Sequence, residues 1–256
     1  MKRNLIFLGT GTSQGVPVIG CSCQVCKSKN KKDNRLRSSV ILQLNKKKIL
    51  IDSGPDFRIQ CLRAGIDKLD AIFYTHEHRD HVAGVDELRT FYYMNKKSIP
   101  IYLTKRVHNA LKQDYSYLFS EEDYFGKPKF DINIIEKSNN FSVFNVNITP
   151  IEVMHYKLPV VGFRVFNLAY ITDANNINKK EMEKLLNLDV LIINCLQIKP
   201  HISHFNLNQA LELIEFLKPK FSYLTHISHN LGLHNEVQKK LPSNVFLAFD
   251  QLQINF

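Results

Sequence analysis

The stretch Thr75–His81 limits the fold and chemistry of this chain more than any other. It reads Thr-His-Glu-His-Arg-Asp-His, so three imidazoles and the carboxylate of Asp80 fall within six residues. Side chains two positions apart point away from each other on a helix, whereas a loop can wrap His76 and His78 around one ion. The apolar run Ala71–Tyr74 directly precedes the cluster and indicates a buried strand. Imidazole and carboxylate ligands suit zinc, manganese or iron, so the stretch predicts a metal site at a strand end.

Length and composition favour one large domain. The chain has 256 residues and 44% hydrophobic content, enough to bury a full core. The apolar run after the basic start ends at Gly9, so it predicts a first strand and not a signal peptide. No apolar stretch of the sequence reaches the length needed to span a bilayer. We therefore expect a single domain over residues 1–256, cytoplasmic and without membrane contact.

The formal charge of +10 invites a nucleic-acid partner, because clustered Lys and Arg release counterions from phosphates. The lysines are nevertheless scattered through apparent turns, and the chain is also rich in Asn and Ile. This composition gives the charge without an RNA partner. An anionic substrate is equally compatible with it.

Three of the five cysteines crowd into the run Cys21–Cys26, too close together for comfortable disulfide pairing. Metal ligation explains them better than an oxidising compartment does, and a reactive or redox cluster is the alternative. Cys61 and Cys195 lie among apolar neighbours, so we expect them to be inert core residues.

Polar residues of ligand type follow several predicted strands. Strand ends that share one edge of a sheet would hold such side chains together, while the loops stay free to vary. Among the predicted elements are one strand over Phe141–Val153, helices over Val85–Tyr93 and Lys105–Leu118, and a helix Leu207–Leu217 capped by Asn206. The strand-end residues are Asp52, His76, His155, Asp173 and His226.

The order His76-x-His78-x-Asp80-His81 resembles the His-x-His-x-Asp-His motif of the metallo-β-lactamase superfamily. The resemblance covers essentially the whole chain, and the later strand-end residues come in the family's order. It implies an α/β (α+β) fold, a four-layer αββα sandwich, with a two-metal site between the loop ends of the sheets.

The resemblance also implies roles for individual residues. His76, His78 and His155 would hold one ion, Asp80, His81 and His226 the other, and Asp173 would bridge them. Asp52 would lie behind the ligands and orient the histidine loop. Taken singly, His155 and His226 would more often be ordinary polar or core histidines. Their place beside the cluster and Asp173 reverses that expectation.

A narrower resemblance joins the two ends of the chain. The spacing Cys21-x-Cys23-x-x-Cys26, with His229 in Thr-His-Ile-Ser-His near the end, resembles the PhnP-like branch of cyclic phosphodiesterases. It implies a structural zinc held by these four residues. Three thiolates and one imidazole close a tetrahedral site to substrate, so this zinc would staple the N-terminal loop to the C-terminal region.

The chemistry that the resemblance implies is phosphodiester hydrolysis with two active-site ions, zinc or manganese. A metal-bridging hydroxide would attack phosphorus, with Asp80 and His204 as catalytic residues and His204 as the general acid for the leaving alkoxide. His201 would be a substrate contact or a solvated residue, and Arg79 would meet a phosphate or point to solvent. The polar loop Ser120–Lys129 would cover or border the site.

We therefore expect a metal-dependent phosphodiesterase acting on a small cyclic or nucleotide-like phosphodiester. One alternative is ribonuclease Z-like processing of tRNA 3′ ends, although the chain lacks that class's Gly/Pro-rich arm. Another is a non-hydrolytic, PqqB-like cofactor-biosynthesis protein, which the full ligand set disfavours. The expected partner is a small phosphodiester, with RNA less favoured and a homodimer allowed.

Overall fold

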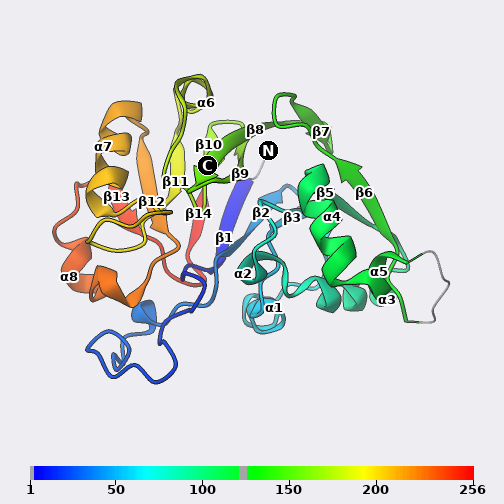
Figure 1. Cartoon of the computed structure of the whole chain (residues 1–256), viewed down its shortest axis with the longest axis horizontal. Helices are drawn as coiled ribbons and strands as arrows, with labels where there is room; N and C mark the ends of the chain where they lie inside the picture. Colours follow the sequence, from blue (N-terminus) through cyan, green and yellow to red (C-terminus); the bar gives the residue numbers. More distant parts are fainter. Residues whose placement is uncertain (1–2, 121–125) are drawn as a thin grey trace.

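Two seven-stranded sheets form the centre of the computed structural model, which describes residues 3–120 and 126–256 (Figure 1). In the first sheet the strand order is β14-β1-β2-β3-β4-β5-β6, and in the second it is β13-β12-β11-β10-β9-β8-β7. The first sheet contains β1 (Arg3–Gly9), β2 (Ser39–Leu44), β3 (Lys47–Ile51), β4 (Ala71–Phe73), β5 (Ile99–Leu103), β6 (Phe130–Ile134) and β14 (Gln253–Asn255). The second contains β7 (Phe141–Val143), β8 (Val146–His155), β9 (Leu158–Val165), β10 (Leu168–Tyr170), β11 (Val190–Asn194), β12 (Phe221–Thr225) and β13 (Val245–Leu247).

Both faces of the sheets are buried, which explains their nearly continuous apolar strands. In β1, Leu5 and Phe7 face the second sheet, whereas Ile6 and Leu8 belong to the core under the helices. Successive side chains of a strand point to opposite faces, so an alternating polar pattern is not needed when helices cover the outer face. This arrangement confirms the predicted α/β sandwich of the metallo-β-lactamase type.

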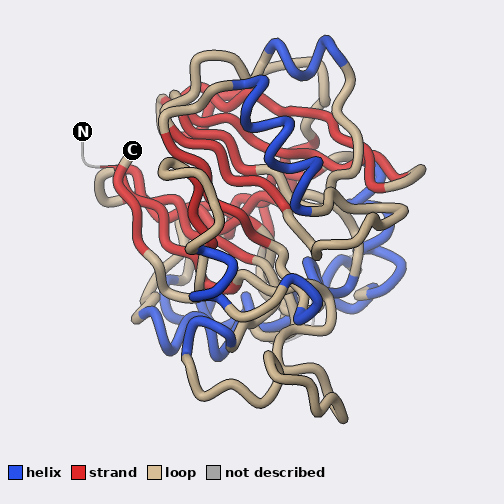
Figure 2. The backbone as a smooth tube through the Cα atoms, turned by 90° about the vertical axis from the view of Figure 1, so that its left-hand side faces the viewer, coloured by secondary structure: helices blue, strands red, loops and turns tan. Residues whose placement is uncertain are grey.

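Helices cover the outer face of each sheet (Figures 1 and 2). The first sheet carries α1 (Phe57–Ala64), α3 (Arg89–Asn95), α4 (Lys105–Asp114) and α5 (Ser116–Phe119), while the short α2 (Arg79–Val82) follows the histidine loop. On the second sheet lie α6 (Lys179–Glu183), α7 (Leu207–Leu217) and α8 (His234–Gln238). Short 3-10 turns occur at η1 (Lys31–Asp33), η2 (Val85–Leu88) and η3 (His229–Leu231). No helix in the described part combines the length and apolar character that crossing a membrane requires.

Three predicted elements differ from the observed ones. The single strand predicted over Phe141–Val153 is a hairpin, because Phe144 and Asn145 adopt left-handed conformations with φ of 52° and 60°. Two consecutive positive φ values make the tight turn that matches strand twist. The helix predicted over Lys105–Leu118 ends at Asp114, and Tyr115 (φ −128°) separates it from α5. The helix predicted from Val85 begins as the 3-10 turn η2.

The helix α7 begins and ends where the sequence predicts. The Asn206 side chain accepts a hydrogen bond from the Gln209 N–H, and the Gln209 side chain accepts one from the Asn206 N–H. This reciprocal capping box satisfies two N–H groups that a helix start leaves free.

Parallel pairing brings the functional loops to one edge. The strands β3 and β4 are parallel neighbours, and so are β10, β11 and β12. Their carboxyl ends therefore lie at the same edge of each sheet. The Val161 N–H donates to the Thr75 carbonyl across 3.1 Å, so the loop after β4 is bonded directly to β9 of the other sheet.

Candidate metal centre

The strand ends bring the predicted ligands together between the two sheets. His76 follows β4, His155 ends β8, Asp173 follows β10 and His226 follows β12. The ring of His76 lies 4.3 Å from that of His81 and 6.0 Å from that of His155, centroid to centroid. Side chains far apart in sequence thus converge on one small volume.

Two histidines of the loop are oriented from behind. The Nδ1–H of His81 donates to Asp52 Oδ2 across 2.7 Å. Thr75 donates its hydroxyl proton to Asp52, so its oxygen accepts the Nδ1–H of His76 at 2.9 Å. Both rings are thereby held in the tautomer that leaves Nε2 facing the centre.

The remaining buried ligands follow the same rule. The Nδ1–H of His155 donates to the Ser203 carbonyl at 2.8 Å. Ser38 donates its hydroxyl proton to a backbone carbonyl, so its oxygen accepts the Nδ1–H of His226 at 3.2 Å. Four imidazoles therefore present Nε2 inward.

The hydrogen-bond partners of the inward-facing nitrogens indicate whether a metal fits between them. Among the described residues, the buried Nε2 atom of His76 has no hydrogen-bond partner, and the Nε2 atom of His81 faces the carboxylates of Asp80 and Asp173 at 3.2 and 3.1 Å. A buried polar atom left unpaired costs free energy, and metal coordination removes that cost. The donor set of imidazole nitrogens and carboxylate oxygens fits divalent zinc or manganese.

The two groups of ligands differ in compactness. The second group is tight: one ligand atom from each of Asp80, His81, Asp173 and His226 lies within 4.8 Å of the others. In the first group the exposed His78 has its ring 4.7 Å from His76 and 5.1 Å from His155. The first group therefore extends from the buried His76 to the exposed His78, whereas the second is compact and mostly buried.

Asp173 contacts more of the centre than any other carboxylate in the described chain. Its Oδ1 lies 3.2 Å from His226 Nε2, and its Oδ2 lies 3.1 Å from His81 Nε2 and accepts the Thr172 hydroxyl. Asp80 reaches the same His81 nitrogen at 3.2 Å. One carboxylate oxygen of Asp173 also lies within 4.8 Å of a ring nitrogen of His155, so Asp173 reaches both groups of candidate ligands.

The protonation pattern shows that the centre attracts positive charge. Burial lowers the pKa of His76 and His155, and it lowers that of His226 to about 4, so these rings stay neutral. Burial acts the same way on His81, but Asp173, Asp80 and Asp52 outweigh it and raise its pKa well above the ordinary value. Three carboxylates in a dry interior require a compensating cation, which a divalent ion supplies.

Three residues of the centre have left-handed backbones, namely Asp52 (φ 63°), Asp173 (φ 53°) and His226 (φ 55°). Such conformations cost about 1–3 kcal/mol for non-glycine residues and concentrate at functional sites. Asp52 and His226 lie directly after β3 and β12, and Asp173 lies three residues after the end of β10. Backbone strain at three strand ends supports a functional role for this edge.

The structure places the other predicted residues as follows. His204 donates from Nε2 to Asp173 Oδ1 at 3.0 Å, so it adjoins the centre. His201 is exposed, with its Nδ1 3.2 Å from His204 Nδ1. Arg79 points away, toward the Tyr115 hydroxyl at 3.0 Å and the Asp114 carboxylate at 3.4 Å. Of its two predicted placements, the one beside a substrate phosphate is not what the structure shows.

The loop over Ser120–Lys129 was expected to cover or border the site, and its described part does not. Lys127 and Lys129 line a separate cavity of about 410 Å³ together with His108. Residues 121–125 lie outside the described part. A cavity of about 450 Å³ does adjoin the centre, and it is lined by His78, Arg106, His155, Tyr156, Lys157, Leu158, Ile202 and Ser203.

Sequence reasoning named Asp52 but missed the other residues that orient the histidines. Thr75 lies inside the motif, yet nothing in the sequence marks its hydroxyl as the acceptor for His76. Ser38 and Ser203 act from distant loops, one by its hydroxyl and one by its carbonyl. A single sequence carries no signal for such contacts, because only the fold brings them together.

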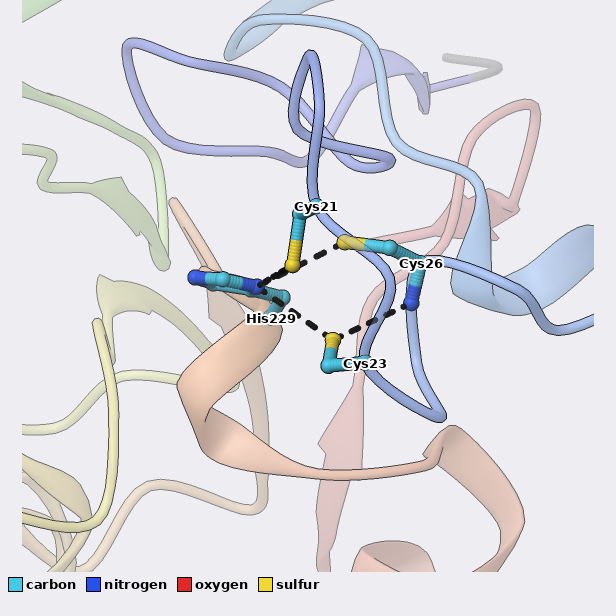
Figure 3. Close-up of side chains that lie close together, drawn as sticks. All are labelled: Cys21, Cys23, Cys26 and His229. Carbon is cyan, nitrogen blue, oxygen red and sulfur yellow. Dashed lines mark hydrogen bonds between the residues drawn. The ribbon is translucent and has the colours of Figure 1, made fainter.

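A second cluster joins the two ends of the chain. The Sγ atoms of Cys21, Cys23 and Cys26 lie 3.3, 3.4 and 3.4 Å from His229 Nδ1 (Figure 3). Tetrahedral zinc with N and S ligands needs such atoms about 3.5–3.8 Å apart. The Cys26 N–H donates to Cys23 Sγ and lowers the pKa of that thiol to about 6, which favours the thiolate that zinc requires.

Replacing Cys23 with Ser should lower thermal stability and zinc content together. Losing one ligand of a closed site removes binding free energy that is also folding free energy. We expect the melting temperature to fall by about 5–10 °C, the shift that a loss of about 2–3 kcal/mol gives in a chain of this size. Calorimetry and elemental analysis of both proteins measure this. The exposed neighbour variant Ser22→Ala should change neither, and full zinc content in the Cys23 variant would refute the structural site.

Replacing Asp52 with Asn should weaken metal binding without unfolding the chain. Asn also tolerates the left-handed backbone, but its neutral amide accepts weakly from His81 and Thr75. Partners behind metal ligands contribute about 10- to 100-fold in affinity. Competition with a chromophoric chelator measures this loss. Asp67→Asn, on an exposed carboxylate paired with Lys48, is the control; equal metal affinity in the two variants would contradict the role of Asp52.

Known proteins resemble this chain in sequence and in fold. A family model described as a beta-lactamase superfamily domain matches residues 47–227. A solved structure described as a new diphosphatase from the PhnP family is 38% identical, with a TM-score of 0.94, and the match covers 100% of this chain and 98% of that one.

More distant structures share the fold alone. Zinc-bound PqqB from Methylobacterium extorquens is 16% identical with a TM-score of 0.83, covering 99% of this chain and 100% of that one. The short form of human tRNase Z is 20% identical with a TM-score of 0.71, covering 98% of both chains.

One curated relative is longer than this chain. An octanoyltransferase of Porphyromonas gingivalis (strain ATCC BAA-308 / W83) is 38% identical over 250 residues, which are 97% of this chain and 50% of that protein. This chain therefore spans about half the length of the curated relative it matches.

Proposed function

This chain belongs to the metallo-β-lactamase superfamily, in its PhnP-like branch, and we propose that it is a metal-dependent phosphodiesterase for small cyclic or nucleotide-like substrates. The observation that carries the proposal is the set of four imidazoles, each anchored at Nδ1, that present Nε2 around Asp173. The similarity to a diphosphatase supports the same attack at phosphorus.

We assign the ligands to two ions. His76, His78 and His155 would hold one, and Asp80, His81 and His226 the other, with Asp173 shared. Zinc or manganese bound here would activate a water molecule at neutral pH and neutralise charge on the phosphoryl oxygens. Asp80 is proposed as catalytic because it would hold the same ion as His81 and His226, and Asp52 orients the His81 ring for that role.

His204 carries the proton in this proposal. Water that has lost one proton to solvent bonds through its oxygen to phosphorus, and the bond to the leaving alkoxide breaks. The alkoxide takes a proton from His204, which solvent then reprotonates. The Nε2 of His204 lies 3.0 Å from Asp173 Oδ1, and its Nδ1 lies 3.0 Å from the Ser203 hydroxyl. These two contacts hold the ring at the centre, where a positioned acid contributes about 10²–10⁴-fold in rate.

The choice of substrate is tested with the metal-loaded chain. Turnover of a 2′,3′-cyclic nucleotide should exceed cleavage of a tRNA precursor under the same conditions. Preference for the precursor would favour a ribonuclease Z-like function. Absence of any phosphodiester turnover with saturating zinc or manganese would favour a non-hydrolytic, PqqB-like role.

A second candidate is hydrolysis or transfer of an acyl group, which the match to an octanoyltransferase favours. That match leaves half of the relative unaccounted for, and either half could carry its activity. Assaying p-nitrophenyl octanoate beside bis(p-nitrophenyl) phosphate separates the two chemistries, because both release the same chromophore. A higher kcat/KM for the octanoate would overturn the phosphodiesterase proposal.

A further inference from the structure

We propose that the cavity beside the metal centre binds the leaving group of the substrate, and that this group carries a flat aromatic ring and a further phosphate. The inference rests on the proposed function and names its substrate class. The cavity has a volume of about 450 Å³ and begins at His78 and His155, so a group leaving the centre passes directly into it.

One cation of this cavity is fixed by the histidine motif itself. The Nε of Arg106, near the start of α4, lies 2.7 Å from Oε1 of Glu77. Glu77 stands between His76 and His78, so the same loop that supplies ligands also positions the guanidinium. The Nη groups of Arg106 remain available for phosphate oxygens, which a planar guanidinium binds in bidentate fashion.

The second cation that lines the cavity is Lys157, in the turn between β8 and β9. Lys157 has no carboxylate partner among the described ion pairs, and its Nζ lies 5.4 Å from the centre of the Tyr156 ring. No Asp or Glu of the described chain lines the cavity. Glu77 partly neutralises Arg106, whereas Lys157 has no such partner among the described ion pairs, so the wall keeps a positive charge that favours an anion beyond the scissile phosphate.

The aromatic surface comes from Tyr156, whose side chain is 52% exposed although the residue has a left-handed backbone (φ 57°). An exposed ring at a cavity wall provides a platform for stacking. Base-to-aromatic stacking contributes favourably whatever the base, so a nucleoside fits this wall.

A single amide holds the two loops of the cavity together. The Oδ1 of Asn175 accepts the Tyr156 N–H at 2.8 Å, and its Nδ2 donates to the Ile202 carbonyl at 2.9 Å. The bond from His155 to the Ser203 carbonyl makes a second tie between the same loops. The walls are therefore fixed relative to the metal centre before any ligand binds, which reduces the entropy lost on binding.

Binding of AMP and adenosine to the metal-loaded chain tests the subsite by calorimetry. Lys157→Ala and Arg106→Ala should each lower the affinity for AMP about tenfold, the loss expected for one charge-assisted contact. The affinity for adenosine should fall less. Tyr156→Ala should weaken the binding of both ligands, whereas Tyr156→Phe, which keeps the ring, should bind them as the unmodified chain does. Lys220→Ala, on a distant lysine paired with Asp189, is the control. AMP affinities in the Lys157 and Arg106 variants equal to that of the control would overturn the proposal.

Hydrolysis assays distinguish a failure of the proposed subsite from a failure of the proposed function. With diadenosine diphosphate, water bonds to one phosphorus, the diphosphate bridge breaks, and the second AMP leaves with the proton. The kcat/KM for diadenosine diphosphate, divided by that for bis(p-nitrophenyl) phosphate, should fall about tenfold in the Lys157 and Arg106 variants, because KM rises. If the variants are active and this ratio of kcat/KM values is unchanged, the subsite is contradicted and the proposed function is not. If the unmodified chain hydrolyses neither substrate, the proposed function is contradicted.

Discussion

Asp173→Asn should lower phosphodiesterase kcat/KM by about 10³-fold or more, the loss expected when several kcal/mol of metal-based stabilisation disappears. Asp173 is the one described carboxylate within 3.2 Å of the inward nitrogens of both His81 and His226. The amide keeps the size of the side chain and tolerates the left-handed backbone, so the fold should persist. What is lost is the negative charge that two ions would share.

Metal content distinguishes this outcome from general damage. Elemental analysis should show fewer active-site ions in the Asp173 variant, while the zinc of the cysteine cluster stays. Asp189→Asn alters an aspartate on the surface, where its partner is Lys220, and should leave metal content and turnover intact. Full metal content with full activity in the Asp173 variant would show that the carboxylate is not shared between ions.

His204→Ala should lower turnover of bis(p-nitrophenyl) phosphate about 10²–10⁴-fold while metal content stays unchanged. The loss should be larger for a diester with an alkoxide leaving group, because p-nitrophenolate leaves with less help from a proton. Kinetics on the two substrates measure this difference. Unchanged turnover would remove His204 from the role of general acid.

A ligand role for His204 gives the opposite metal result. One ligand atom from each of His155, Asp173 and His204 lies within 4.8 Å of the others, so these residues could also hold an ion. In that case His204→Ala would lose metal together with activity. His108→Ala, which alters a histidine at the separate cavity, should leave both unchanged and serves as the control.

The sandwich is predicted by the resemblance that the His76–His81 motif carries, and two features of the sequence agree with it. Strands such as β1 and β4 are apolar on both faces, which indicates a sheet covered on both sides. Ligand-type residues recur at strand ends, as Asp52 does after β3 and His155 does as the last residue of β8. The family resemblance is confirmed by the match over residues 47–227 and by the PhnP-family diphosphatase.

The details that the sequence could not supply depend on contacts between distant segments. Ser38 bonds to a histidine 188 positions away, and Asn175 joins two loops through its amide. Neither residue differs in type from many other polar loop residues. Arg79 was singled out because it lies in the motif, whereas the cation at the cavity is Arg106, which only the position of α4 brings near.

Metal-dependent turnover is the most direct test of a binuclear hydrolytic centre. The chain is dialysed against a chelator that leaves the cysteine-bound zinc, and manganese or zinc is then added in steps while hydrolysis of bis(p-nitrophenyl) phosphate is followed. We predict that activity is absent after dialysis and returns to a plateau at two added ions per chain. Hydrolysis that survives complete removal of active-site metal, or none at any metal concentration, would contradict the account.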